Sequence, residues 1–228
     1  LVMNHRDHRK IMVIDGRIAY TGGVNIADEY ANLIERFGYW KDSGVCLEGE
    51  GAWGLTASFI RMCVNLGGVM HNEHDYYRPH TPVKSEGFCQ PFTDGPQNNP
   101  DNPAEDVFLQ MISGARRFLY ITTPYFIPDE SLMRALCIAG DGGVDVRLML
   151  PGKPDHWYAD CVAESYFGEL IKHSVKVYRY TPGFLHGKSI MVDREAAFVG
   201  SANMDYRSFE LDYELSLIHI SEPTRRVV

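Results

Sequence analysis

Helical stretches alternate with short apolar runs from residue 104 to residue 180. We expect helices over residues 104–114, 131–139 and 157–172, and strands over residues 118–126, 144–150 and 175–180. Strands separated by helices of about 10 to 15 residues are typical of a parallel sheet. This part of the chain therefore predicts an α/β fold with a largely parallel sheet that helices cover on both faces.

The first part of the chain has a different pattern. Two short apolar runs, residues 10–14 and 17–20, flank Asp15-Gly16, and this dipeptide between apolar runs is a strong signal for a hairpin. An apolar stripe at helical spacing follows over residues 53–66. From residue 67 to residue 102 the chain is dense in Gly, Pro, Asn and His, which predicts a long connection between two halves.

Composition narrows the class of protein. The chain has 228 residues, of which 45% are hydrophobic and 23% charged, as in ordinary folded proteins. Its formal net charge of −8 disfavours a protein that grips nucleic acid along the backbone, and no window approaches 18 consecutive apolar residues. The widely spaced cysteines favour reduced thiols in a core over a zinc site or disulfides. They are Cys46, Cys63, Cys89, Cys137 and Cys161.

One stretch of sequence occurs twice. It reads HRKIMVIDGRIAYTGGVN over residues 8–25 and HGKSIMVDREAAFVGSAN over residues 186–203. Both copies contain the pattern H-x-K-x-x-x-x-D, formed by His8, Lys10 and Asp15 and by His186, Lys188 and Asp193. Chance does not readily place two such matches in register, so the repeat indicates a shared chemical role.

The spacing of the motif places a histidine beside a lysine, because residues i and i+2 of a strand point to the same face. A nucleophile or acid next to a fixed cation suits attack on an anionic centre such as a phosphodiester, whose oxygens two lysines would neutralise. One histidine would attack phosphorus while the other protonates the leaving alkoxide, so the two halves must meet at one site. The alternatives are purely structural histidines and a metal site, for which a lysine between the ligands is a poor neighbour.

The duplicated motif resembles that of the phospholipase D superfamily, which carries two H-K-D motifs. The surrounding sequence is similar to that of bacterial cardiolipin synthases, notably in the stretches NHRKIMVIDGRIAYTGGVNIADEY, ITTPYFIPDESLMRAL and YRYTPGFLHGKSIMVD. The resemblance implies a phospholipase D-like α/β fold of two pseudo-symmetric halves, each a mixed or parallel sheet flanked by helices. It also implies transfer through a phosphohistidine, without metal or organic cofactor: one phosphatidylglycerol donates its phosphatidyl group, releasing glycerol, and a second accepts it to give cardiolipin.

The resemblance also assigns roles to residues. In the superfamily a carboxylate downstream of each motif orients the catalytic histidine, and the matching positions here are Asp42 and Glu214. The resemblance favours His8 as the nucleophile and His186 as the general acid and then base.

The remaining candidates have less certain roles. The motif aspartates, Asp15 and Asp193, follow their strands, so we expect them to be paired or to cap turns. Residues that either donate hydrogen bonds to a phosphate or support turns are Asn25, Ser201 and Asn203.

Relatives of this kind usually carry membrane-spanning segments and further strands before the first motif. We therefore expect a truncated first half over residues 1–66, a connection over 67–102 and a second half over 103–217. Residues 218–228 resemble a translated sequencing adapter, with a natural divergent end as the alternative. Because Pro223 interrupts any strand, we expect no sheet there and give His219 no role.

The expected partners are phosphatidylglycerol and a membrane surface, with no nucleic acid. The expected location is the bacterial inner membrane, to which segments outside this chain would anchor the protein. Two other function classes stay open: a hydrolase or nuclease of the same superfamily, and a fragment without catalytic activity.

Overall fold

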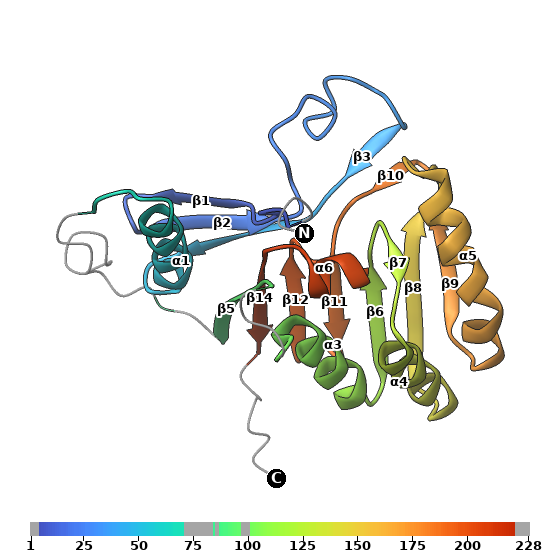
Figure 1. Ribbon diagram of the computed structural model, residues 1–228. Coiled ribbons are helices and arrows are strands. Elements are labelled where there is room, and N and C mark those ends of the chain that lie inside the picture. The colour runs from blue at the N-terminus through green and yellow to red at the C-terminus, as the bar shows by residue number, and fades with distance from the viewer. Residues whose placement is uncertain (1–4, 71–83, 85–86, 97–100, 222–228) are drawn as a thin grey trace, which may run out of the picture.

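The computed structural model describes residues 5–70, 84, 87–96 and 101–221. Its main body is a seven-stranded sheet with the strand order β5-β14-β12-β11-β6-β8-β9 (Figure 1). These strands are β5 (Phe88–Asp94), β6 (Phe118–Thr122), β8 (Asp145–Pro151), β9 (Lys176–Tyr180), β11 (Ser189–Val192), β12 (Ala196–Gly200) and β14 (Glu214–Ile220). Only β6, β8 and β9 pair in parallel, and every other pairing in the sheet is antiparallel.

The mixed α/β fold agrees with the expected fold class. The parallel pairing expected for residues 104–180 is confirmed for β6, β8 and β9, whereas the rest of the sheet is antiparallel. The second copy of the repeat folds as an antiparallel hairpin, β11 and β12, and β14 and β5 extend the sheet beyond it in the same alternating sense. Helical crossovers lead from β6 to β8 and from β8 to β9, and a parallel pairing needs such a crossover connection.

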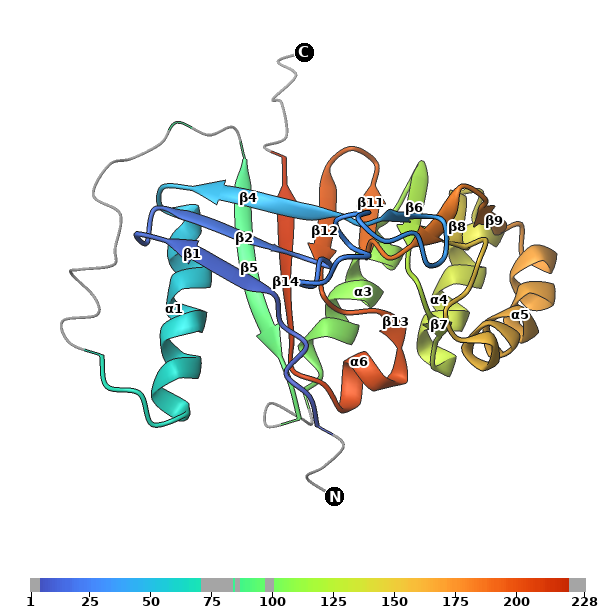
Figure 2. The ribbon, with the colours of Figure 1, turned by 90° about the horizontal axis from the view of Figure 1, so that it is seen from above.

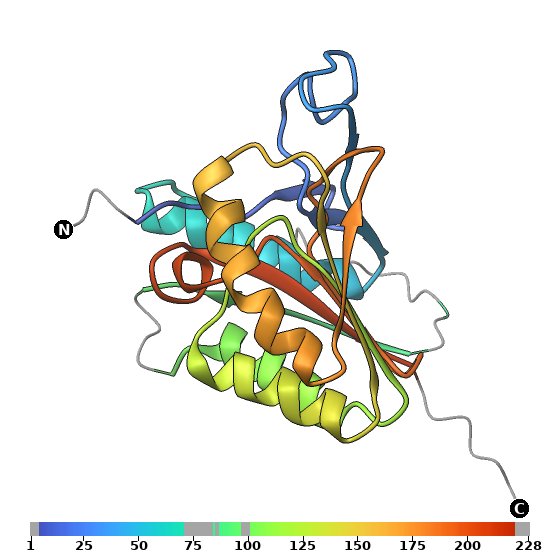
Figure 3. The same ribbon diagram turned by 90° about the vertical axis from the view of Figure 1, so that its right-hand side faces the viewer.

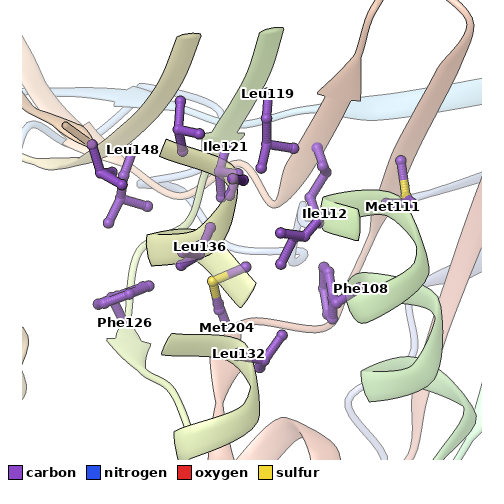
Figure 4. Close-up of a cluster of buried hydrophobic side chains, with 14 of the residues drawn as sticks. Phe108, Met111, Ile112, Leu119, Ile121, Phe126, Leu132, Leu136, Leu148 and Met204 are labelled. Carbon is purple, nitrogen blue, oxygen red and sulfur yellow. The ribbon is translucent and has the colours of Figure 1, made fainter. Parts of the chain in front are cut away.

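Helices cover one face of the seven-stranded sheet. They are α3 (Pro103–Gly114), α4 (Glu130–Asp141) and α5 (Trp157–Lys172), close to their expected ranges. Their apolar stripes and the strand residues that face them form the larger core, in which Phe108, Leu136 and Ile121 meet (Figure 4). Burial of this apolar area is the main source of stability for the part of the chain that holds the second motif.

The other face is covered by a second, smaller sheet and only at one end. This sheet has the order β1-β2-β4 and carries α1 (Gly51–Asn65) beside it (Figure 2). Its strands are β1 (Ile11–Ile14), β2 (Ile18–Gly22) and β4 (Gly44–Glu48). A small core joins Ala19 and Leu55 to Leu215 and Leu217 of β14. On the same face of the large sheet, farther from β14, Tyr178 and Met191 are exposed, so the described residues do not cover both faces as expected.

Strand β5 lies inside the range that composition predicts as a connection. It pairs with β14 along its whole length, although Pro91 stands in its middle. A proline lacks the N–H that a second neighbour would need, which suits a strand at the edge of a sheet. The rest of the expected connection lies mostly outside the described residues.

The expected end of the second half at residue 217 is also crossed by a strand. β14 continues through Ile218, His219 and Ile220, which pair with β12 and β5. The expectation of no sheet in this region is therefore wrong for these three residues. The strand ends before Pro223, which lies outside the described residues.

Two short parallel pairings tie the halves and loops together. β3 (Tyr39–Lys41) pairs with β10 (Gly183–Leu185), and β7 (Phe126–Ile127) pairs with β13 (Met204–Asp205) ahead of α6 (Tyr206–Glu210). The single strand expected over residues 118–126 is thus two strands, β6 and β7.

The cysteines are free thiols, but none lies in the buried core and Cys46, Cys89 and Cys161 are exposed.

The two motif aspartates occupy equivalent hairpin turns. Asp15 and Gly16 both have positive φ, as the sequence indicates, and Asp193 and Arg194 adopt the same backbone in the second turn. The carboxylate of Asp193 accepts hydrogen bonds from the backbone N–H groups of residues 116, 117 and 118 at 2.8–2.9 Å. Burial opposes the charge of Asp193, but these three donors hold its pKa below the ordinary value. Asp15 is exposed in its turn.

We predict that Asp193→Asn lowers the free energy of unfolding by about 1–3 kcal/mol at pH 7, because the amide replaces an acceptor by a donor facing buried N–H groups. Asparagine tolerates positive φ, so the change leaves the turn itself intact. Because folding lowers the pKa of Asp193, the wild-type advantage is present at neutral pH and declines as the pH falls below about 3.8.

The matched control is Asp15→Asn, for which we expect a change within about 0.5 kcal/mol. Chemical denaturation of both variants measures the difference. Equal effects at the two turns would contradict the anchoring role of Asp193.

Candidate active site

Both motifs lie in extended segments that lead directly into strands. His8 and Lys10 precede β1, and His186 and Lys188 precede β11. In each copy the lysine turns back to the carbonyl of its own histidine: Lys10 Nζ donates to His8 O at 2.6 Å, and Lys188 Nζ to His186 O at 2.7 Å. The two copies of the repeat therefore build the same local arrangement.

The histidines and the downstream carboxylates form two crossed pairs. His8 Nδ1 lies 3.0 and 3.1 Å from the two carboxylate oxygens of Glu214, and His186 Nδ1 lies 2.7 Å from Asp42 Oδ2. Each carboxylate thus contacts the histidine of the other motif, so the expectation that it orients the histidine of its own motif is wrong. A carboxylate on Nδ1 fixes the tautomer and leaves Nε2 as the reactive nitrogen.

Parallel backbone pairing positions both pairs. Before Asp42, β3 pairs with β10, so that Lys41 lies opposite Leu185 and accepts a hydrogen bond from the backbone N–H of His186 at 2.7 Å. Before Glu214, Tyr213 forms a parallel bridge with Asp7. In both places the residue before the histidine lies opposite the residue before the carboxylate, which brings the two side chains together.

Burial of the cationic groups changes their pKa values. Burial lowers the pKa of Lys188 to about 7 and that of Lys10 to about 8, although the carboxylates of Asp42 and Glu214 act in the opposite direction. Burial and the neighbouring Lys188 also lower the pKa of His186, to about 4. The site therefore holds fewer protons at neutral pH than its composition suggests.

The two histidines differ in access. The His8 side chain is 28% exposed, whereas the His186 side chain is 8% exposed. His186 is covered by an aromatic group that includes Trp40 and Phe184, whose ring centroids lie 5.6 and 5.9 Å from its own. A substrate therefore reaches His8 more directly than His186.

The remaining candidate residues differ in the partners of their side chains. The hydroxyl of Ser201 is fully buried and donates to Glu214 Oε2, so it supports this carboxylate and is not free for a phosphate. Asn203 is buried, and its Oδ1 has no hydrogen-bond partner among the described residues. Asn25 donates from Nδ2 to the hydroxyl of Tyr30 at 2.6 Å. Neither motif aspartate takes part in these contacts.

Tyr30 is the residue that sequence reasoning misses. Its hydroxyl lies 3.5 Å from His186 Nε2, and its ring meets the His186 ring edge-on at 5.1 Å. Because Asn25 already donates to the Tyr30 oxygen, the hydroxyl hydrogen is free to point to Nε2. Tyr30 lies in a loop without periodicity, five residues after Asn25, and an aromatic residue so soon after the motif is the only signal the sequence offers.

Comparison with known proteins identifies the family to which the chain belongs. The family described as "Cardiolipin synthase, PLD-like domain" matches residues 108–227. The chain belongs to this family. The family assignment agrees with the resemblance that the two H-K-D motifs indicate.

Curated relatives in this family are more than twice as long as the chain. The cardiolipin synthase of Halalkalibacterium halodurans is 41% identical over 215 residues, which cover 94% of this chain and 42% of the relative. The major cardiolipin synthase of Bacillus subtilis is 41% identical over 220 residues, which cover 95% of this chain and 45% of the relative. The chain thus spans less than half the length of these relatives.

A solved structure shows the shared fold. The crystal structure of phosphatidylserine synthase from Haemophilus influenzae Rd KW20 aligns with 96% of this chain and 58% of its own, with a TM-score of 0.68 and 19% sequence identity. At this identity the similarity extends to the arrangement of strands and helices.

No group of three His, Cys, Asp or Glu side chains in the described part of the chain is placed to hold a metal ion. The crossed pairs use one carboxylate per histidine, and a lysine stands beside each histidine. The charged groups of the site thus suit an anionic ligand better than a cation.

We predict that an oxyanion binds the site more weakly as the pH rises from 6.5 to 9. The unbound lysines lose their protons near pH 7 and pH 8, and an anion binds the protonated forms. Tungstate is the suitable probe, because its own charge stays constant over this range.

The measurement is calorimetric titration in buffers of different ionisation enthalpy. We expect uptake of protons on binding at pH 8 and a dissociation constant at pH 9 at least about tenfold above that at pH 6.5, since one lost proton per pH unit changes affinity tenfold. Binding without proton uptake would contradict the lowered lysine pKa values.

Proposed function

We propose that the site transfers a phosphatidyl group through a phosphohistidine, converting two molecules of phosphatidylglycerol into cardiolipin and glycerol. The observation that carries the proposal is the pair of crossed histidine–carboxylate contacts, each with a lysine on its histidine. The names of the relatives support the lipid substrate. Because the chain spans less than half of those relatives, the activity of the whole protein is part of the proposal.

In the first step His8 Nε2 attacks the phosphorus of a bound phosphatidylglycerol. The P–N bond forms as the P–O bond to glycerol breaks, and His186 gives a proton to the leaving alkoxide. In the second step the hydroxyl of another phosphatidylglycerol gives its proton to His186 and attacks phosphorus, which breaks the P–N bond. The greater exposure of His8 supports its role as nucleophile.

To act as the general acid, His186 must hold a proton. Substrate binding must therefore raise its pKa from about 4. A bound phosphodiester places negative charge between the two lysines, which offsets the effect of Lys188 on His186 and favours the imidazolium. Glu214 and Asp42 stabilise whichever ring becomes cationic. The two histidines then share one proton in the active state.

We further propose that the reaction needs no metal or organic cofactor, and that residues 1–66 and 103–217 belong to the two halves of one catalytic unit. The described residues contain no helix long and apolar enough to cross a membrane. Location at the bacterial inner membrane, with anchoring by segments outside this chain, stays part of the proposal.

Hydrolysis is the second candidate. Water is smaller than a lipid alcohol and reaches the same phosphohistidine, and the crossed pairs alone do not select the acceptor. The product, phosphatidic acid, distinguishes it from transfer. A nuclease is disfavoured by the net charge of −8.

Product analysis with labelled phosphatidylglycerol in mixed micelles tests the proposed function. We expect cardiolipin and free glycerol in equal amounts, at a rate that a chelator leaves unchanged.

We also expect Lys10→Ala and Lys188→Ala each to lower kcat/KM by at least about 10²-fold, the loss typical of removing one preorganised donor to a charged transition state. Phosphatidic acid as the main product, or no turnover of lipid, would contradict cardiolipin synthesis.

The roles of the histidines are tested by trapping the phosphoenzyme. With a substrate whose leaving group needs no proton, we expect His186→Ala to accumulate the covalent intermediate and His8→Ala to form none. Mass spectrometry of the acid-quenched protein identifies the modified residue. Phosphate on His186 would reverse the assignment, and no intermediate in any form of the protein would exclude the two-step route.

A further inference from the structure

The loop between β2 and β3 (residues 23–38) exposes large aliphatic side chains. Val24, Leu33 and Ile34 are 48%, 76% and 55% exposed, and Ile26 is fully exposed. Four such residues within eleven positions form a continuous apolar tip. Figure 3 shows the loop, in blue at the top, extending beyond the rest of the molecule.

The exposure does not come from a lack of structure. Asn32 exchanges two hydrogen bonds with the backbone of Trp40, and the Tyr30 ring packs on the Trp40 ring with a centroid distance of 4.5 Å. The backbone N–H of Leu33 donates to the carbonyl of Asp28 at 2.9 Å. The loop is therefore braced from within while its aliphatic side chains point to solvent.

The same loop forms part of the candidate active site. Tyr30 approaches His186, and Asn25 holds Tyr30, so the inner side of the loop faces the reacting groups while its tip faces outward. A hollow of about 340 Å³ within the loop is lined by Asn25, Tyr30 and apolar residues that include Val24 and Ile26. Val24 and Ile26 of the tip thus line the same hollow as Tyr30, which approaches His186.

A second exposed apolar group lies at the same end of the molecule. The first turn of α5 carries Trp157 and Tyr158, both largely exposed, and this end of α5 rises beside β10 on the side of the loop (Figure 1). Just before α5, Asp155 accepts a hydrogen bond from the hydroxyl of Tyr125 at 2.6 Å. Tryptophan and tyrosine favour the boundary between water and lipid.

We propose that the tip of the β2–β3 loop, with the first turn of α5, inserts into the surface of a phospholipid bilayer and brings the site to its lipid substrate. The proposal rests on the proposed function, because a lipid-converting site beside an apolar tip receives its substrate from the bilayer. Exposed apolar residues beside a site mark an interaction surface. The exposed charged residues of the loop, Asp28, Glu35 and Arg36, sum to a charge of −1, so charge gives the loop no attraction to anionic lipid and the binding is apolar in nature.

Vesicle partitioning tests the proposal without requiring turnover. The probe is unilamellar vesicles of phosphatidylcholine with one fifth phosphatidylglycerol, sedimented with the chain. We expect wild type to bind and Ile26→Ser/Leu33→Ser to bind at least about tenfold more weakly, since each aliphatic side chain withdrawn from lipid loses its transfer free energy. Binding should survive 0.5 M NaCl, which screens charges but leaves apolar contacts in place.

The chain offers matched controls. Ile138→Ser/Ile171→Ser changes two aliphatic residues of α4 and the last turn of α5 that are each 61% exposed, and we expect less than a twofold effect. Ile26→Phe/Leu33→Phe should retain binding, because the side chains stay apolar. All these positions are exposed, so equal melting temperatures verify folding.

Several outcomes overturn the proposal. Absence of vesicle binding by wild type would do so, as would loss of binding only in Met12→Ser, which changes an exposed residue of β1. A wild-type dimer in sedimentation analysis that the loop variant dissociates would assign the tip to a second copy of the chain. Loop-dependent binding together with a lack of product would uphold this inference while contradicting the proposed function.

Discussion

The site depends on one constraint, the parallel backbone pairing that aligns each histidine with a carboxylate from the other part of the chain. The β3–β10 pairing aligns Asp42 with His186, and the bridge between Asp7 and Tyr213 aligns Glu214 with His8. Each carboxylate is distant in sequence from the histidine that it contacts. Because each motif needs a residue from the other part, loss of either pairing disables one histidine while its motif remains intact.

The charges of the site are balanced for a ligand that is itself charged. Two lysines and two carboxylates surround two histidines, and burial holds the lysine pKa values far below their usual range. Keeping a cationic side chain such as Lys188 fully buried is unfavourable for folding, which is common where residues serve binding more than stability. An entering anion would restore the protons that burial removes, so ligand charge and site charge are coupled.

Sequence reasoning could predict the motifs, the first hairpin turn, the four long helices and the involvement of Asp42 and Glu214, because each rests on a local pattern or on sequence that resembles known relatives. It could not predict the crossed pairing, since periodicity carries no information about contacts between distant segments. It missed β5, where Gly and Pro-rich composition concealed an edge strand around Pro91. It left Ser201 open between a phosphate donor and support of a turn, whereas in the fold its hydroxyl donates to Glu214.

The long separation between His8 and Glu214 has a consequence for synthesis. The two residues are 206 positions apart, and Glu214 begins β14, the last described strand. At about 5–20 residues per second, a ribosome delivers Glu214 on the order of 10–40 s after His8. The nascent polypeptide thus lacks an oriented first histidine until β14 has emerged and entered the sheet. Orientation of His8 therefore waits, through topology alone, until β14 has been synthesised.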